Sequence, residues 1–333
     1  MKTKKPLKIM EVCGTHTHAI AKSGLKDFFD GEIDFISGPG CPVCVSAQSD
    51  IDKMISLALM PNITIMTFGD MMRVPGSKIS LQGAAQSGAD VKIVYSPLDA
   101  VIFALQNPKK QVVFLAVGFE TTAPLIAAAI LKAKELKLKN FFIYSCLKTI
   151  TPAIKTILDE KNDIDGFLLP GNVSVITGWQ AFDFISKKYK KPAVAAGFSP
   201  KEIIEAAKML LATKTPKTQN VYRWASPKGN KEAQKAIKKV FSIGDGVWRG
   251  LGKIAGSALV LKSSYKNFDA EKVFKIKKIK ETKTKCRCAL ILKGKLKPSL
   301  CPFFAKTCTP TSPLGPCMVS SEGACAAWYN NLK

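Results

Sequence analysis

The sequence has few histidines, few arginines and no long apolar run. Only two of its 333 residues are histidine, His16 and His18, so any site that needs imidazole must use them. Only four of the 50 basic residues are arginine, and base readout and bidentate phosphate clamping favour arginine over lysine. The longest apolar runs, such as residues 125–131, fall well short of the roughly 20 residues that cross a bilayer. These shortages argue against nucleic-acid binding and against a membrane-spanning protein.

Lysine gives the chain its strong positive charge. There are 50 basic residues against 25 acidic ones, a formal net charge of +25. Because the lysines are scattered, with one concentration over residues 262–285, they indicate a solvated surface or a basic face for an acidic protein partner. The 47% hydrophobic and 23% charged content excludes a mainly disordered chain. Residues 1–10 are basic and lack the apolar core of a signal peptide, so we expect a cytoplasmic protein.

Short apolar runs alternate with helix-like segments over the first two hundred residues. The expected strands are residues 7–11, 33–37, 63–67, 91–95, 112–117, 140–145, 166–169 and 193–196, and the expected helices are residues 49–60, 98–106, 123–137, 151–159, 178–188, 200–212 and 231–240. Strands made almost entirely of Val, Ile, Leu, Met and Phe are typical of parallel sheets covered on both faces. The alternation therefore predicts an α/β fold with parallel sheets.

We expect three domains in chain order. Residues 1–107 form an N-terminal α/β domain with the CGTHTH and CPVC motifs, residues 108–213 form a second α/β domain, and residues 214–333 form a C-terminal domain with a cysteine-rich segment. One large sheet is the alternative to two α/β domains. We favour two domains because Pro108 and two lysines interrupt the pattern near residue 107.

The ten cysteines fall into two main groups. In a reducing compartment they are more typical of metal ligands or redox thiols than of structural disulfides. In the first group, Cys13, His16 and His18 follow an expected strand, and thiolate with imidazole is a ligand set for iron or zinc. If this segment is extended, both histidines face one side and can address one site. The alternative is a pair of loop histidines bonded to backbone.

A second motif, GPGCPVC at residues 38–44, also follows an expected strand. Its glycines let the backbone approach a ligand closely. Cys41 and Cys44 can close a disulfide, exchange thiols or bind one metal ion, and the alternative is a structural pair of small buried residues. Because this motif and Cys13 end neighbouring strands, we expect three thiols to converge.

Two further positions carry weaker signals. Glu120, in the GFETTAP motif, is expected at the rim of a site where a strand ends and a helix begins. Alone, this motif is equally typical of an ordinary helix start. Cys146 lies within an apolar strand and is expected to be a small core residue.

The second group of thiols lies in the last fifty residues. It comprises Cys286, Cys288, Cys301, Cys308, Cys317 and Cys325. Structural zinc sites present short, regular knuckles, whereas the spacing here is irregular, with prolines beside the thiols. This favours an iron–sulfur cluster over zinc, with free or disulfide-bonded thiols as the remaining alternative. Only four ligands are needed, so two thiols are spare.

Together these motifs resemble the HypD family of nickel–iron hydrogenase maturation proteins. The matching stretches are MEVCGTHTH, SGPGCPVCV, TFGDMMRVPGS, VYSPLDA, AVGFETTAP, WRGLG and CPFFAKTCTPTSPLGPCMVSSEGACAAWY, in order from residue 10 to residue 329. The resemblance implies a scaffold on which iron receives cyanide and carbon monoxide, giving the Fe(CN)2CO unit of the hydrogenase large subunit. It implies a HypC-type chaperone that shares the iron and a HypE-type cyanide donor as partners. The implied fold is two parallel-sheet α/β domains facing a cleft, plus a small C-terminal domain with a 4Fe–4S cluster.

The resemblance also implies roles for single residues. Cys13 is the leading iron ligand, with His16 as a second metal ligand and His18 close by, and Cys41 and Cys44 are the redox pair in the same cleft. Glu120 is the remaining candidate catalytic residue. For the cluster we choose Cys288, Cys301, Cys308 and Cys325, with Cys286 and Cys317 as rivals. The sequence departs from the family at position 172, where Asn172 replaces a histidine and puts a metal or proton-transfer role there in doubt. Ala289, Leu290 and Ser199 also differ from the family pattern.

Three hypotheses follow. The first is a maturation scaffold with a redox role in cofactor assembly rather than a stand-alone enzyme. The second is an iron–sulfur thiol–disulfide oxidoreductase that works without maturation partners. The third is a lysine-rich nucleic-acid-binding protein with a zinc domain, which would show steeply salt-dependent binding. We expect the first, with no binding to nucleic acid or membrane.

Overall fold

The computed structural model describes residues 5–282 and 284–332. The chain divides into two compact units, each built from separate segments. The first unit comprises Met1–Cys44, Ile150–Lys231 and Cys286–Lys333, and the second comprises Val45–Thr149 and Glu232–Lys285. The two units therefore cross the domain boundaries expected at residues 107 and 213, because strand pairing joins the first forty residues to the segment after residue 150.

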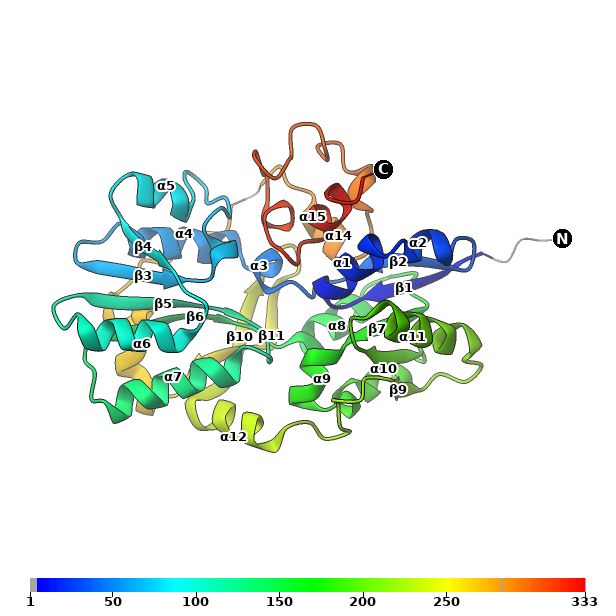
Figure 1. Ribbon diagram of the computed structural model, residues 1–333, viewed down its shortest axis with the longest axis horizontal. Helices are drawn as coiled ribbons and strands as arrows, with labels where there is room; N and C mark the ends of the chain where they lie inside the picture. The colour runs from blue at the N-terminus through cyan, green and yellow to red at the C-terminus, as the bar shows by residue number, and fades with distance from the viewer. Residues whose placement is uncertain (1–4, 283, 333) are drawn as a thin grey trace. The chain divides into compact units, whose positions relative to one another are not determined.

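The first unit contains a five-stranded parallel sheet in the order β2-β1-β7-β8-β9 (Figure 1). Its strands are β1 (Leu7–Glu11), β2 (Ile33–Ser37), β7 (Gly166–Pro170), β8 (Ala193–Ala196) and β9 (Thr218–Asn220). Strands β7 and β8 are buried throughout and β1 is buried over its last three residues, which explains their apolar sequence. The three residues of β9 lie in a stretch whose polar sequence gives little strand signal.

Short helices connect these strands and complete the first unit. They are α1 (Gly14–Lys22), α2 (Leu25–Phe28), α3 (Pro42–Val45), α8 (Ile150–Asp159), α9 (Gly171–Thr177), η2 (Trp179–Phe182), α10 (Asp183–Lys187) and α11 (Pro200–Ala212), followed in the cysteine-rich segment by α14 (Cys288–Leu292), η4 (Pro298–Leu300), η5 (Pro316–Met318) and α15 (Ala324–Tyr329). A capping box of Ser199 and Glu202 starts α11. Ile203 and Leu210 of that helix pack into a core with Ile9 and Ile20.

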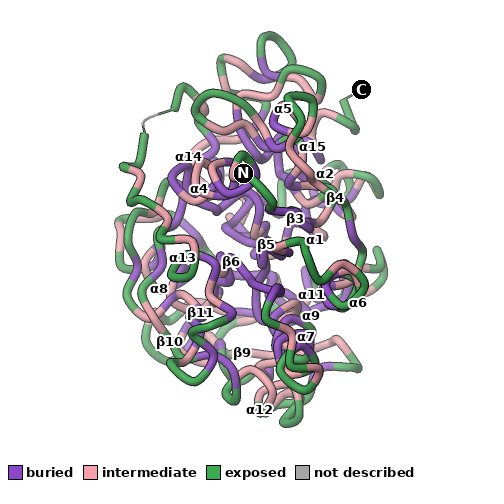
Figure 2. Tube along the Cα trace, turned by 90° about the vertical axis from the view of Figure 1, so that its left-hand side faces the viewer, coloured by how far each residue is buried: buried purple, intermediate pink, exposed green. Residues whose placement is uncertain are grey.

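The second unit contains a four-stranded parallel sheet in the order β4-β3-β5-β6 and an antiparallel hairpin of β10 and β11. The strands are β3 (Ile63–Thr67), β4 (Asp90–Ile93), β5 (Gln111–Gly118), β6 (Phe141–Leu147), β10 (Phe241–Trp248) and β11 (Gly252–Leu261). Figure 2 shows β5 and β6 running through buried, purple parts of the trace. The hairpin packs on β6 and adds Phe241, Leu259 and Leu261 to the core of this unit.

The helices of the second unit follow its strands. They are α4 (Gln48–Ala58), η1 (Gly69–Met71), α5 (Leu81–Gln86), α6 (Pro97–Gln106), α7 (Ala123–Glu135), α12 (Lys231–Val240), which begins at the last residue of the first unit, η3 (Ser263–Phe268) and α13 (Ala270–Val273). Helix α6 begins with a capping box of Ser96 and Asp99 and with Pro97 in its first turn, three signals that fix its start. None of the helices within residues 5–282 and 284–332 combines the length and apolar character needed to cross a membrane.

The structure confirms the predicted fold class of two parallel sheets with a cysteine-rich C-terminal region. All eight predicted strands occur, with their ends within two residues of the expected positions. The helix expected over residues 178–188 is instead split into η2 and α10, after Gly178 at φ +84°. The sequence analysis did not foresee the β10–β11 hairpin.

Candidate functional site

Cys13 lies beside the point where the strand order of the first unit reverses. Strand β1 pairs with β2 on one side and with β7 on the other, so the chain winds outward in both directions from this place. In parallel sheets, ligands bind beyond the carboxyl ends of the strands at such a switch point. Cys13 comes two residues after β1 ends and is the N-cap residue of α1, with an extended backbone. The topology thus puts this thiol where a ligand site is expected.

The prediction that His16 and His18 share one face of an extended segment was wrong. Both residues lie in α1, and in a helix with 3.6 residues per turn, side chains two positions apart point in clearly different directions. His16 is fully buried, whereas His18 is half-buried. Helix α1 forms because His16 and Ile20, one turn apart, both face the interior.

His16 is held as a neutral imidazole. Its Nε2 atom lies 2.8 Å from the carbonyl oxygen of Gly197, and because a carbonyl only accepts hydrogen bonds, Nε2 carries the proton. The ring also packs 4.7 Å from that of Phe198. Burial lowers the pKa of His16 to about 4. The buried Nδ1 atom has no hydrogen-bond partner among the described residues, so it offers a lone pair of the kind that binds metal ions.

Gly40 brings the second cysteine motif against Cys13. A Cβ atom at residue 40 would stand 1.4 Å from the carbonyl oxygen of Val12 and 2.6 Å from the Cα atom of Cys13. Only glycine allows the two chain segments to pass at this distance. The residue before Cys41 therefore lies directly on the backbone of Cys13, and the structure brings the two predicted motifs together.

Cys41 and Cys44 form a disulfide, with their Cα atoms 5.2 Å apart. Helix α3 begins at Pro42, and the backbone N–H of Cys44 donates a hydrogen bond of 3.1 Å to the Sγ atom of Cys41. Both cysteines are buried. The sequence analysis named this pair as redox-active without fixing its oxidation state.

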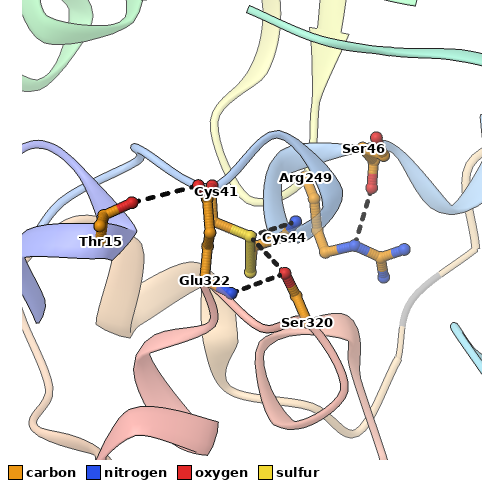
Figure 3. The surroundings of a disulfide bond; sticks show 7 residues. All are labelled: Thr15, Cys41, Cys44, Ser46, Arg249, Ser320 and Glu322. Carbon is orange, nitrogen blue, oxygen red and sulfur yellow. Dashed lines mark hydrogen bonds between the residues drawn. A yellow bond between two sulfur atoms is a disulfide. The ribbon is translucent and has the colours of Figure 1, made fainter. Parts of the chain in front are cut away.

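The tail of the first unit contributes two residues that the sequence analysis did not single out. Figure 3 shows Ser320 and Glu322 beside the disulfide and the start of α1. The Oγ atom of Ser320 lies 3.3 Å from the Sγ atom of Cys41, and the Thr15 hydroxyl donates a hydrogen bond of 3.2 Å to Glu322. Burial, followed by the nearby Glu322 carboxylate, raises the pKa of Cys13 to about 11.

Five of the six tail cysteines line one cavity of the first unit. They are Cys286, Cys288, Cys301, Cys308 and Cys325, and apolar side chains including Ile291, Phe304 and Met318 line the rest. Burial, followed by the neighbouring thiols, raises the pKa of Cys325 well above its usual range. The backbone N–H of Leu314 donates to the Sγ atom of Cys308 at 3.4 Å, a hydrogen bond of the kind that tunes cluster sulfurs.

Cys317 does not line this cavity. It is fully buried in η5, and Gly323 packs against its backbone.

Within residues 5–282 and 284–332, no three His, Cys, Asp or Glu side chains are arranged so that they could hold one metal ion. Ligands of a cubane cluster each bind a different iron atom and so stand farther apart than the ligands of a single ion. A set of cavity-lining thiols fits such a cluster better than it fits zinc.

Glu120 belongs to the second unit. Strands β3 and β5 form the switch point of that sheet, and Glu120 follows β5, with most of its surface buried. The ring of the preceding Phe119 stacks on Trp248, with centroids 5.9 Å apart. Glu120 thus lies beside the switch point of the second unit, after the strand that corresponds to β7 of the first unit.

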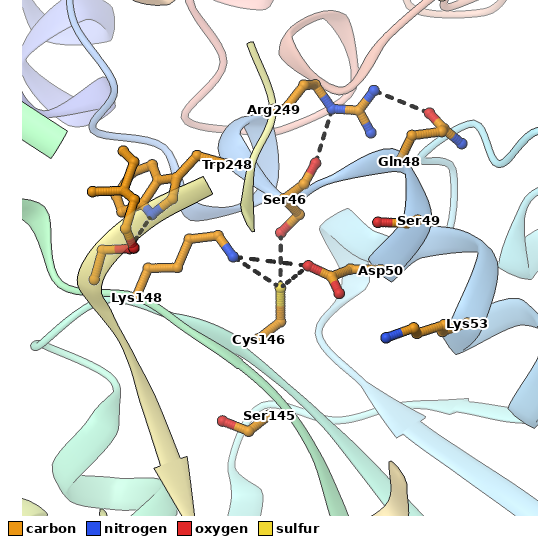
Figure 4. Close-up of polar contacts among 12 residues, drawn as sticks. Ser46, Gln48, Ser49, Asp50, Lys53, Ser145, Cys146, Lys148, Trp248 and Arg249 are labelled. Carbon is orange, nitrogen blue, oxygen red and sulfur yellow. Dashed lines mark hydrogen bonds and ion pairs between the residues drawn. The ribbon is translucent and has the colours of Figure 1, made fainter. Parts of the chain in front are cut away.

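Cys146 is buried in β6, as predicted, but it is also the centre of a polar cluster (Figure 4). Its Sγ atom lies 3.5 Å from the Ser46 hydroxyl, from a carboxylate oxygen of Asp50 and from the Nζ atom of Lys148. The Tyr144 hydroxyl donates to Asp50 at 2.9 Å. Burial raises the pKa of Cys146 to about 11, so the thiol stays protonated.

Comparison with known proteins finds similarity over nearly the whole chain. The family model HypD, described as "Hydrogenase formation hypA family", matches residues 1–332. The chain belongs to the HypD family.

Individual HypD proteins are similar over nearly all of the chain. The hydrogenase maturation factor HypD of Escherichia coli (strain K12) is 45% identical over 332 residues, which cover 98% of this chain and 89% of that protein. The factor of the same name in Rhodobacter capsulatus is 42% identical over 336 residues, again with 98% and 89% coverage. That of Cupriavidus necator is 41% identical, with 96% and 88% coverage. Membership of this family places the chain in hydrogenase maturation.

Proposed function

We propose that this HypD-family protein is an iron-binding scaffold on which the Fe(CN)2CO unit of nickel–iron hydrogenase is assembled. Iron is the substrate, taken up by Cys13 with His16 as a further ligand. A HypC-type chaperone shares the iron, a HypE-type protein donates cyanide, and the hydrogenase large subunit receives the finished unit indirectly. We place this work in the cytoplasm, where thiols such as Cys13 stay reduced.

The approach of Gly40 to Cys13 is the observation that carries the proposal. It sets the Cys13 thiol beside the Cys41–Cys44 pair near the carboxyl edge of one sheet, which supports iron binding and redox chemistry at one place. A soft thiolate suits low-spin iron(II) with cyanide and carbon monoxide ligands. The neutral imidazole of His16, with its proton on Nε2, supports the same chemistry because Nδ1 keeps a lone pair.

The disulfide gives the scaffold a place to hold two electrons. Reduction breaks the bond between Cys41 and Cys44 and leaves two thiols, and reoxidation returns two electrons. The cavity thiols Cys288, Cys301, Cys308 and Cys325 are our choice for holding a 4Fe–4S cluster, with Cys286 as the rival that also lines the cavity. When bound, such a cluster supplies electrons one at a time.

Infrared spectroscopy tests the assignment. The protein is produced anaerobically with its HypC-type partner, and bands of iron-bound cyanide and carbon monoxide are expected. Cys13→Ala is expected to lose the bands, whereas Cys146→Ala, a change at a buried thiol of the second unit, is expected to keep them. Bands that persist in Cys13→Ala would remove iron binding from this residue.

A thiol–disulfide oxidoreductase is the second candidate, and the closed Cys41–Cys44 bond favours it. This function requires turnover of a protein or small-molecule disulfide without any maturation partner. The purified chain is assayed anaerobically with an insulin-type disulfide substrate and a reductant, with Cys41→Ser as the control. We expect no turnover above that of the control.

A further inference from the structure

The two sulfurs of the Cys41–Cys44 disulfide have unequal surroundings. Among the described residues, the Sγ atom of Cys41 has two hydrogen-bonding neighbours, the Cys44 backbone N–H at 3.1 Å and the Ser320 hydroxyl at 3.3 Å. Ser320 lies 279 positions further along the chain and is only 1% exposed. Its hydroxyl therefore meets Cys41 away from bulk water, where a hydrogen bond to a charged group is strongest.

The direction of the Ser320 hydrogen bond follows from the chemistry of the sulfur. A disulfide sulfur carries no hydrogen, so the hydroxyl must donate and the Sγ atom of Cys41 must accept. The backbone N–H of Glu322 donates to the oxygen of the same hydroxyl at 3.2 Å. With its oxygen accepting from Glu322, Ser320 can direct its proton at Cys41 (Figure 3).

We propose that Ser320 stabilises Cys41 as a thiolate when the disulfide opens, which makes Cys41 the leaving sulfur and makes the pair easier to reduce. This inference rests on the redox role proposed above for Cys41 and Cys44. A hydrogen bond to a thiolate stabilises the reduced form, and stabilisation of the reduced form raises the reduction potential of a disulfide. Neutral sulfur is a weak acceptor, so the oxidised form gains less.

The step balances for a dithiol as the reductant. One thiolate of the dithiol attacks the Sγ atom of Cys44, forms a mixed disulfide and breaks the Cys41–Cys44 bond. The electron pair of that bond goes to Cys41, which leaves as the thiolate that Ser320 and the Cys44 N–H hold. The second thiolate of the dithiol then displaces Cys44, which takes up a proton, and the reductant ends as a disulfide.

A redox titration tests the effect on the potential. The full chain is equilibrated in dithiothreitol buffers without iron or partners, and the free thiols of Cys41 and Cys44 are counted by mass spectrometry after alkylation. Ser320→Ala is expected to lower the equilibrium constant for reduction about 10-fold, which is about 30 mV for two electrons. Ser321→Ala, a change at the exposed neighbouring serine, is expected to match the unaltered protein.

Ser320→Thr and Ser320→Val form a second pair of variants, whose side chains are similar in size and differ mainly in the hydroxyl group. Threonine is expected to keep the potential and valine to lower it, and any folding disturbance from the added bulk is common to both. Equal potentials in Ser320→Ala and the unaltered protein, or in the Thr and Val variants, would overturn the inference. The iron-binding proposal, which is tested by infrared bands, would still stand.

A trapping experiment needs no variant at Ser320. Glutathione is added to the unaltered oxidised protein, the reaction is quenched with acid, and peptide mass spectrometry locates the glutathione. The inference requires the mixed disulfide on Cys44, because Cys41 is the sulfur that leaves. A mixed disulfide mainly on Cys41 would contradict it.

Discussion

Gly40 lies directly against Cys13, with no room for a side chain between the two segments. A Cβ atom at residue 40 would overlap the carbonyl oxygen of Val12 at 1.4 Å. The neighbouring atoms are backbone, which cannot rotate away as a flexible side chain would. The position of the disulfide motif beside Cys13 therefore depends on one missing methyl group.

Gly40→Ala is expected to separate the two segments. Because the clash is with backbone, we expect a loss of about 2–4 kcal/mol in the free energy of unfolding, measured by urea denaturation. Gly83→Ala is the matched control, since its Cβ would meet its nearest neighbour at 3.4 Å in the interior of α5. The control is expected to be neutral or stabilising by up to about 1 kcal/mol. Equal stability of the two variants would show that the close approach is not needed.

The lowered pKa of His16 predicts a pH dependence of stability. Burial lowers this pKa from 6.5 to about 4, so between these values the unfolded state binds more protons than the folded state. Stability should then rise with pH from about 4 to 6.5 and be lost as pH falls, by up to about 3 kcal/mol from this residue. The His16→Gln variant is expected to lack this contribution, whereas His18→Gln should retain it.

The raised pKa of Glu11 predicts the opposite pH dependence of stability over part of the same pH range. Burial raises that pKa from 4.5 to about 7, so over this range the folded state binds more protons and stability falls as pH rises. Over the pH range in which both groups titrate, the change in stability from Glu11 therefore opposes the change from His16. The difference between the unaltered protein and His16→Gln, measured by urea denaturation at each pH, isolates the histidine. A pH-independent difference would rule out the buried neutral imidazole.

Serine substitutions of tail cysteines should have different effects on cluster content, depending on whether the cysteine lines the cavity. Cys308→Ser, in the cavity wall, is expected to lose most of the iron and sulfide and the visible absorbance after anaerobic purification. Cys317→Ser, outside the cavity wall, is expected to keep them. Cys286→Ser decides whether the rival thiol is a ligand. Loss of the cluster in Cys317→Ser with retention in Cys308→Ser would refute the choice of ligands.

Lys148 and Asp50 form a partly buried ion pair whose coupling can be measured. Their charged atoms lie 3.9 Å apart, and the side chain of Lys148 is only 4% exposed against 20% for Asp50. Lys148→Met leaves Asp50 without this cation and is expected to cost about 2–4 kcal/mol of unfolding free energy. The double variant with Asp50→Asn should recover part of that loss in a double-mutant cycle. Strict additivity of the two changes would mean that the pair does not interact.

Local sequence was enough to predict every strand of the two parallel sheets except β9, and several helix starts. Strand β5 is apolar over seven consecutive residues and is buried almost throughout, so burial and sequence carry the same information. Helix α11 has both partners of its capping box and a proline in its first turn. Helix α1 lacks these signals, since no side chain caps it and its first turn has no acidic residue, and it was missed.

Long-range relationships left no local signal. The hydrogen bond between Ser320 and Cys41 spans 279 positions, and the residues next to Ser320 in sequence give no sign of its partner. Likewise, β1 pairs with β2, which is next in sequence, and with β7, which lies far along the chain. The segments that make up each compact unit therefore could not be predicted from their order in the chain. Strand pairing and tail docking depend on the shape of the folded chain.

The interleaving of the two units sets an order for synthesis on the ribosome. The second unit has all its segments once residue 285 has left the ribosome. The first unit has all its segments only when the cysteine-rich tail that begins at Cys286 has also been made. Residues 5–44 leave the exit tunnel well before the tail and become fully packed only after it has been made. During that interval Cys13, Cys41 and Cys44 are open to oxidants and free metal ions, so a newborn chain depends on the reducing state of its surroundings until its own tail closes over them.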